Sequence, residues 1–582
     1  MPWTLRHVSA EGGRVHECKG GMSTLGIFIG TDAFTEAELQ AELTPRAPGT
    51  PSDPAVLPRF THACRAVADY GACGQPNSRH NATVLLTRCI AAKLGYLLES
   101  LPPHLTSKFA HMAHDLLLAA YREVNGLTEE ETRRAFDRLV LPTSKRGCGL
   151  RFYPDTAPAG YISGRLHTSA AVISAVETAE AAQAAAAASE AVAAAGAGAS
   201  AATPTAAVPA DGAATTPSPV ADISADIAAA LRSLPGSARA EVDLSDIGGE
   251  AKAIFEKYKG VQRKMTHEVE KAREKSMHAS VDAALAAEVP NSERHAAALR
   301  TKAHLNPCDG GWVNAPPLSH MRLPNTLFAI RLRRYLNLPI PVCEDIGDGA
   351  GSARPPRSGD GKPWDPLGDF TLSTFNIAHA AQWLNWHEDE KLFWYNTAKQ
   401  AGITGVTQEK HVKGKQKIRP GDVGITSTNH GWKAAEGKGL LLDVAHASAV
   451  CGQWVAKCAK EAGGGAAGKN AEKHDYYKGK IPDDQHFISL ASESEGRKCR
   501  EAGQLLHAWS KLWAERRGES KAAAARMLFK WTTELDFRNA KNLAKCINER
   551  ALLSKEMQDN EDKVGGDVRP PLSSHVDLFT VR

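Results

Sequence analysis

The feature that most constrains this chain is a long alanine-rich stretch in its first half. From Ser169 to Leu234 the sequence consists mainly of Ala with Gly, Pro, Thr and Ser. Such a composition supplies too few large apolar side chains to build a packed core. Ala favours transient helix over residues 170–195, whereas Gly and Pro interrupt the part after Gly196, which we expect to be disordered. We therefore interpret residues 169–243 as a linker between two folded parts.

Length, charge and cysteine content narrow the class of protein. The 582 residues are enough for several domains, and the net charge is only +4, so any nucleic-acid-binding surface must be local. The 11 cysteines include no CxxC pair, which argues against a disulfide scaffold. No apolar run approaches the ~18 residues of a membrane span, and the first residues lack the apolar core of a secretory signal. We expect an intracellular protein, nuclear or cytoplasmic, without a membrane partner.

Apolar side chains at helical spacing predict several amphipathic helices. Residues 77–101 and 105–120 each carry one apolar stripe, and a Pro-Pro pair separates them. Thr128 and Glu131 form the capping-box pattern T-x-x-E, which predicts a third helix over residues 129–139. A strand is predicted over residues 22–30. Further helices are expected over 249–287 (a charged segment that we interpret as a solvated surface helix), around 327–335 with a basic cluster, over 383–401, and in two amphipathic segments after residue 500.

Two basic segments are candidates for nucleic-acid contact. In LPTSKRGCGLRFYP, Lys145 and Arg146 could touch phosphate, and an exposed loop is the alternative. The second segment, EKHVKGKQKIR, carries five cations against one acid, Glu409. Such a run would hold phosphates and make binding salt-dependent. Its cations are Lys410, Lys413, Lys415, Lys417 and Arg419.

Residues 419–444, RPGDVGITSTNHGWKAAEGKGLLLDV, contain two short apolar runs that each carry one aspartate, Asp422 and Asp443. Gly, Asn and Lys between them suit a hairpin turn. Two antiparallel strands would bring the carboxylates together at one end of a small sheet. Such oxygen ligands hold Mg²⁺ or Mn²⁺ for phosphodiester hydrolysis. From spacing alone, the alternative is two aspartates at strand ends that turn amides satisfy.

Three segments in the first 165 residues resemble the reverse transcriptase of non-LTR retrotransposons, from just after the catalytic aspartates through the thumb. They read STLGIFIGTDAF, RHNATVLLTRCIAAKLGYLLESLPPHL and LPTSKRGCGLRFYPDTAPAGYI. The YxDD motif of the polymerase is absent from the sequence. The resemblance therefore implies the C-terminal part of an element's reading frame, and we expect no reverse transcriptase activity.

The second half resembles the restriction-enzyme-like endonuclease region that follows the polymerase in these elements. The matching segments are GGWVNAPP with FAIRLRRYLNLPIPVC, then RPGDV, LLLDVAHA, and NAEKHDYYKGKIPDDQHFISLASESEGR. The resemblance implies that Asp422 and Asp443 bind metal. Ala445 stands where a PD-(D/E)xK nuclease has its lysine, so this role passes to Lys473, and Glu409 could complete the metal shell.

The resemblance also places a Cys/His knuckle before the nuclease strands. Here Cys343 remains, but Phe370 and Thr374 stand where the family tends to have His and Cys. His387 matches the family's later His position loosely. A closed structural zinc site needs four ligands, so the sequence argues against zinc.

These observations predict an α+β multidomain protein. Its parts would be a helical reverse transcriptase thumb and tail (1–168), the linker (169–243), a charged helical segment (244–303), a helix with the degenerate knuckle (304–400), and a small PD-(D/E)xK-like core with C-terminal helices (401–582). Three functional hypotheses stay open. They are a Mg²⁺- or Mn²⁺-dependent DNA endonuclease, a non-catalytic remnant that binds DNA or element RNA, and a decayed reading frame. The oligomeric state is left open.

Overall fold

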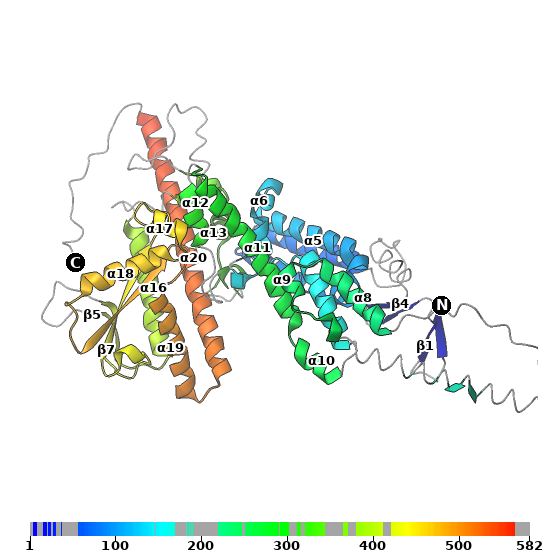
Figure 1. Cartoon of the computed structure of the whole chain (residues 1–582). Coiled ribbons are helices and arrows are strands. Elements are labelled where there is room, and N and C mark those ends of the chain that lie inside the picture. Colours follow the sequence, from blue (N-terminus) through cyan, green and yellow to red (C-terminus); the bar gives the residue numbers. More distant parts are fainter. Residues whose placement is uncertain are drawn as a thin grey trace, which may run out of the picture. The chain divides into compact units, whose positions relative to one another are not determined.

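The structure is a computed structural model, in which the described residues form two compact units (Figure 1). One unit comprises residues 1–64, 90–118 and 151–273, and the other comprises 65–89, 119–150 and 274–582. These units cross the predicted domain boundaries, because segments of the first 168 residues contribute to both. The structure describes residues 4–8, 15–19, 21–24, 27–30, 56–145, 147–168, 219–246, 251–289, 292–301, 311–315, 321–343, 365–369, 380–410 and 421–564, with a few isolated residues before 190.

The first unit combines short hairpins with helices. Strand β1 (Thr4–Val8) pairs antiparallel with β2 (Val15–Lys19), and β3 (Gly21–Thr24) pairs with β4 (Ile27–Gly30). The segment predicted as one strand over residues 22–30 is therefore a pair of strands. The helices of this unit include α4 (Gly95–Ser100), α8 (Pro219–Arg232), α9 (Gly236–Arg239) and α10 (Ala251–Tyr258), with the 3-10 turn η3 (Leu244–Asp246). Residues 153–168 are helical as well.

The end of the Ala-rich stretch is folded, in contrast to the disorder expected after Gly196. Helices α8 and α9 lie inside the predicted linker and pack against later residues of the first unit. Ile227, Leu231 and Leu234 recur at helical spacing and are buried with Tyr258. An apolar stripe of this kind gives a helix a face to bury, even where the average composition is poor in large side chains.

Three helices belong partly to each unit, and the helix predicted over residues 77–101 is interrupted. The shared helices are α2 (Val56–Ala72), α5 (Pro103–Asn125) and α11 (Val261–Ala286). Between α3 (Ser78–Val84) and α4 the chain forms a π-helical segment, η1 (Leu85–Ile90), and a turn.

The capping box predicted at Thr128 is confirmed. Helix α6 (Glu129–Val140) begins directly after it. The Thr128 hydroxyl accepts a hydrogen bond from the Glu131 amide at 3.2 Å, and the Glu131 carboxylate accepts one from the Thr128 amide at 2.7 Å. Two backbone donors that the helix itself cannot satisfy are thus paired at its N-terminus.

The second unit contains a four-stranded mixed sheet of order β5-β6-β7-β8. Strands β5 (Val406–Lys410), β6 (Gly421–Ile425) and β7 (Gly439–Ala447) are antiparallel neighbours, whereas β8 (Gln485–Glu493) runs parallel to β7. The predicted hairpin is therefore β6 and β7. Helices dominate, and the strands form two short pairs and this small mixed sheet, so the α+β prediction is confirmed at this level.

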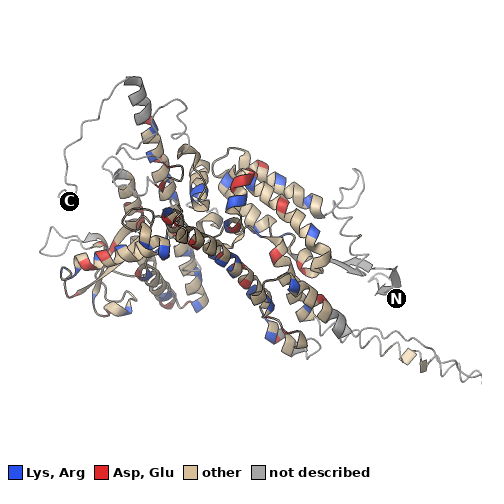
Figure 2. Ribbon diagram, turned by 45° about the horizontal axis from the view of Figure 1, so that its top comes forward, with Lys and Arg blue, Asp and Glu red and all other residues tan. Residues whose placement is uncertain are grey.

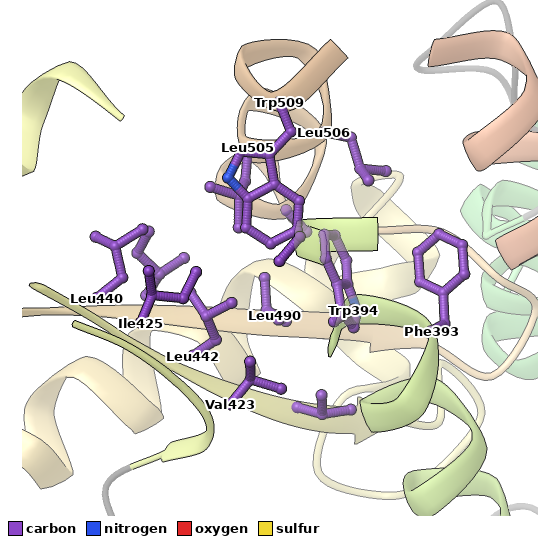
Figure 3. Packing of buried hydrophobic residues seen from close by; sticks show 14 of the residues in the cluster. Phe393, Trp394, Val423, Ile425, Leu440, Leu442, Leu490, Leu505, Leu506 and Trp509 are labelled. Atoms are coloured by element: carbon purple, nitrogen blue, oxygen red, sulfur yellow. The ribbon is translucent and has the colours of Figure 1, made fainter. Parts of the chain in front are cut away.

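Helices cover both faces of the sheet. On one face lie α16 (Ala380–Gln400), α19 (Arg500–Arg517) and α20 (Lys521–Val564), and on the other lies α18 (Gly464–Tyr477), which contacts the short helix α17 (Val455–Lys460). Alternation along β7 explains this arrangement. Leu440 and Leu442 pack with Trp394 and Trp509 on the first face (Figure 3), whereas Leu441 packs with Tyr477 and Phe487 on the second.

The regions predicted as separate at residue 400 share one core. Helix α13 (Asn325–Leu336) lies with α12 (Ser292–Arg300) and the 3-10 turn η4 (Gly311–Asn314) in the second unit. Ile330, Trp386, Val450 and Ile547 are buried in the same cluster. A boundary near 400 would cut through this cluster, so residues 321–564 behave as one packed body in their described parts.

The basic cluster on α13 is buried. Arg331 and Arg334, each 1% exposed, both pair with Glu495 just after β8. Arg333 pairs with Glu131 of α6. These cations therefore hold elements of the second unit together rather than offering a basic surface.

Charges of both signs alternate along the exposed helices (Figure 2). Helix α11, for example, carries Lys271 three residues after Glu268, with their charged atoms 3.4 Å apart. Exposed pairs of this kind contribute little to stability. None of the helices in the described ranges combines the length and apolar character needed to cross a membrane.

Candidate functional site

Strands β6 and β7 place Asp422 and Asp443 side by side. Val423 of β6 pairs with Leu442 of β7, so the next position outward brings Asp422 opposite Asp443. Val423 and Leu442 belong to the core under α16 and α19. By alternation, Asp443 points to the opposite face, where α18 lies, whereas Asp422, near the end of β6, reaches His387 of α16.

Two hydrogen bonds fix the carboxylate of Asp422. Its Oδ2 accepts from the Val444 amide at 2.7 Å, and its Oδ1 lies 3.1 Å from Nε2 of His387 on α16. Burial alone would raise the pKa of Asp422, but the hydrogen bonds and charge of His387 outweigh it and hold the pKa below its usual value. Burial likewise opposes the charge on His387, yet the bond to Asp422 raises the pKa of His387.

Lys473 of α18 forms an ion pair with Asp443. Its Nζ is 2.8 Å from Oδ2 of Asp443, and the side chains are 25% and 8% exposed. Burial raises the pKa of Asp443 to about 6, with the neighbouring Asp422 adding to the rise and Lys473 opposing it. Asp422 is thus readily ionised, whereas burial disfavours the charged form of Asp443. A bound cation would stabilise that charged form.

The structure brings together three of the four predicted catalytic residues. Asp422, Asp443 and Lys473 come from two strands and a helix and converge at one end of the sheet. Glu409 lies in β5 between Gln408 and Lys410, but its side chain is outside the described residues.

His387 is a site residue that the sequence analysis did not assign. Its only sequence signal was the loose match to a family His position. The contact with Asp422 depends on how α16 packs on the sheet, and this packing is not visible in local periodicity.

Most of the residues predicted to contact nucleic acid lie outside the part of the chain that the structure describes. These are Lys413, Lys415, Lys417, Arg419 and Arg146. Lys145, at the end of the 3-10 turn η2 (Thr143–Lys145), pairs with Glu274 at 3.0 Å, and both side chains are less than one fifth exposed. A lysine neutralised in this way has less charge to offer a phosphate, so its predicted role loses support.

A second polar cluster lies behind the site, under α16. Oε2 of Glu390 is 3.5 Å from Nε2 of His446 and 3.3 Å from the Ser492 hydroxyl, which is 3.0 Å from the other ring nitrogen of His446. Burial raises the pKa of Glu390 to about 7 and lowers that of His446 to about 3. The cluster is therefore uncharged in the acidic range, as its burial among apolar side chains requires.

The donor set fits a hard divalent cation. Mg²⁺ is commonly held by one or two carboxylates while it keeps several waters, so Asp422 and Asp443 suffice as protein ligands. Oδ2 of Asp443 is buried and has no hydrogen-bond donor in the described ranges apart from its ion pair with Lys473. A larger cluster of three or more His, Cys, Asp or Glu ligands does not occur within those ranges. Cys343, the remaining knuckle residue, is buried in an apolar cluster with Ile330 and Ile340.

A groove of about 1330 Å³ runs along α19 on the other side of the sheet. It is lined by the segment from Thr428 to Glu436 and by one stripe of α19 that includes Arg500, Gln504, His507 and Lys511. None of the three converging residues lines this groove, so the site at Asp443 lies apart from it.

No protein-family model matches the chain, and a search of curated proteins found no match.

Proposed function

We propose that the second unit is a metal-dependent endonuclease that cuts one strand of DNA, in a protein derived from a non-LTR retrotransposon. The observation that carries this proposal is that Asp422 lies opposite Asp443 on paired strands and that Nζ of Lys473 lies 2.8 Å from Oδ2 of Asp443. Two adjacent carboxylates and one lysine at the end of a mixed sheet are the groups that phosphodiester hydrolysis needs. DNA and element RNA are the proposed partners.

Each side chain has a definable task. When bound, Mg²⁺ or Mn²⁺ would lower the pKa of a coordinated water and offset charge on the phosphate. Asp422 and Asp443 would hold the cation. His387 fixes the orientation of Asp422 through Oδ1. The Lys473 ammonium would contact a phosphate oxygen and stabilise the negative charge that develops during in-line displacement.

Ala445 occupies the position where such nucleases usually have their lysine, but a lysine still reaches the site. Lys473 reaches Asp443 from α18 instead of from the strand. The chemistry requires an ammonium near the carboxylates, and it does not require that this group come from β7.

Nicking of supercoiled plasmid by the full chain tests the proposal. We expect cleavage with Mg²⁺ or Mn²⁺ and none with EDTA. Asp422→Asn and Asp443→Asn should reduce cleavage to the EDTA level, and Lys473→Met should slow it roughly 100- to 1000-fold, the range seen when one charge-stabilising group is removed.

Asp475→Asn is the matched control, because Asp475 is an exposed acid on the same helix as Lys473. It should cut like the unmodified protein. A folded protein that cuts with neither metal, or that cuts equally well in all four variants, would overturn the proposal.

A further inference from the structure

An exposed tyrosine stands next to the candidate catalytic lysine. Tyr476, three residues after Lys473 on α18, is 58% exposed. It is the only tyrosine or tryptophan more than about a third exposed among the described residues. By contrast, the next residue, Tyr477, is buried and packs against Phe487 with their ring centroids 4.8 Å apart. A large part of the Tyr476 ring is therefore in contact with water.

Contacts connect this ring to the site. The Lys473 ammonium that pairs with Asp443 lies 5.9 Å from the centroid of Tyr477. The rings of Tyr477 and Tyr476 meet edge to face at 4.8 Å. Tyr476 is therefore separated from the candidate catalytic lysine by a single aromatic side chain.

One lysine lies over the exposed ring, and further lysines are close to it in sequence. Lys480 lies over Tyr476 with its Nζ 3.5 Å from the ring centroid. Residues 469–480 contain four lysines and two acids, and one of these acids, Glu472, is already paired with Lys469 at 2.6 Å. The exposed carboxylate of Asp475 is the remaining acid. The local balance thus favours a polyanion over a neutral or acidic partner.

We propose that Tyr476 stacks on an unpaired base of the bound strand, while Lys480 contacts a neighbouring phosphate. This inference rests on the proposed nuclease function and names its substrate class. A base inside a duplex has both faces covered by its neighbours, so a protein ring can stack only on a base that is single-stranded, flipped or at a splayed end. The substrate is therefore DNA with unpaired bases beside the cleaved phosphate.

Binding in EDTA tests the inference without cleavage. The probe is a fluorescein-labelled oligonucleotide with a 2-aminopurine, either single-stranded or annealed to its complement. Tyr476→Ala should weaken single-strand binding roughly tenfold or more, as loss of one base–aromatic stack does, and should leave duplex binding unchanged. Tyr476→Phe keeps the ring and should bind within about twofold of the unmodified protein, with the same quenching of 2-aminopurine.

Phe529→Ala is the control, because Phe529 is another exposed aromatic, 47% exposed, on α20. It should not change binding. Equal single-strand affinity of Tyr476→Ala and the unmodified protein, or equal losses in Tyr476→Ala and Tyr476→Phe, would overturn the stacking role. A chain that nicks plasmid but shows no Tyr476-dependent binding keeps the nuclease and loses this inference. A protein that binds single strands through Tyr476 but never cuts DNA would keep the stacking role and lose the proposed nuclease function.

Discussion

Removal of the Glu495 carboxylate should destabilise the second unit. The side chain is 1% exposed and lies just after β8. One oxygen pairs with Arg331, and the other accepts from Nε of Arg334 at 2.9 Å. Arg334 has a second carboxylate partner in Asp369, whereas Glu495 is the one carboxylate that pairs with Arg331 in the described part of the chain.

The expected loss follows from what Arg331 retains in Glu495→Gln. Its guanidinium keeps a long contact to the backbone carbonyl of residue 495, at 3.4 Å, and lies 5.0 and 5.5 Å from the ring centroids of Trp312 and Tyr335. Loss of one partner from a buried ion pair costs about 3–5 kcal/mol, because the other charge stays buried without compensation. The two rings offset part of this cost, so we expect about 3 kcal/mol.

Urea unfolding followed by tryptophan fluorescence measures this loss. Ten of the 11 tryptophans lie between residues 312 and 531, so the signal reports on the second unit. With a denaturant slope of about 2–3 kcal/mol/M, the midpoint should fall by roughly 1 M. Glu130→Gln is the control, because Glu130 pairs only with exposed arginines, and its midpoint should not move. A midpoint for Glu495→Gln equal to that of Glu130→Gln would refute the reasoning.

Two further predictions concern other buried carboxylates. Burial raises the pKa of Glu390 from 4.5 to about 7, so the folded protein binds this proton more tightly than the unfolded chain, and stability falls as pH rises from about 4.5 to about 7. Ionisation of Glu390 should cost the folded protein on the order of 2–3 kcal/mol of unfolding free energy, and Glu390→Gln should remove this cost. The urea midpoint of Glu390→Gln should therefore exceed that of the unmodified protein at pH 8 and equal it at pH 4. An equal gain at both pH values would contradict this prediction. Glu493 accepts hydrogen bonds from the Gly465 and Ala466 amides at the start of α18, at 3.0 and 3.3 Å. Glu493→Ala should speed amide exchange in α18 roughly tenfold while α19 keeps its protection, and unchanged exchange in α18 would show that this contact does not anchor the helix.

Local patterns predicted much of the second unit. The capping box at Thr128 and the hairpin that carries Asp422 and Asp443 depend on residues close in sequence, and the structure has both. The long-range features were not accessible in this way. Arg331 reads as surface charge in its helix, because its partner Glu495 lies 164 residues away. His387 meets Asp422 only through the packing of α16 on the sheet.

The average composition of the Ala-rich stretch predicted disorder where a few large apolar residues in fact form a buried helix face. The Ala-rich stretch ends in α8, whose Ile227 and Leu231 are buried although the average side chain around them is small. Averaging hydrophobicity over many residues hides a few large apolar side chains, whereas the stability of the fold depends on the apolar surface area that these side chains bury.

The small residues around Lys473 explain how a helix can supply a lysine that the strand lacks. Ala445 of β7 pairs in register with Ala491 of β8, and both are buried in one cluster with Ala466 of α18. On the other side of the helix, a Cβ on Gly468 would lie 2.2 Å from the ring of Trp454, so only glycine permits this approach. Small side chains at these positions let the start of α18 lie close to the sheet, and Lys473, about two turns later, then reaches Asp443. A lysine at position 445 would occupy the space that α18 fills. The alanine at position 445 and the contact between Lys473 and Asp443 are therefore two consequences of the same close packing, and Gly468→Ala should disturb this ion pair without changing either of its members.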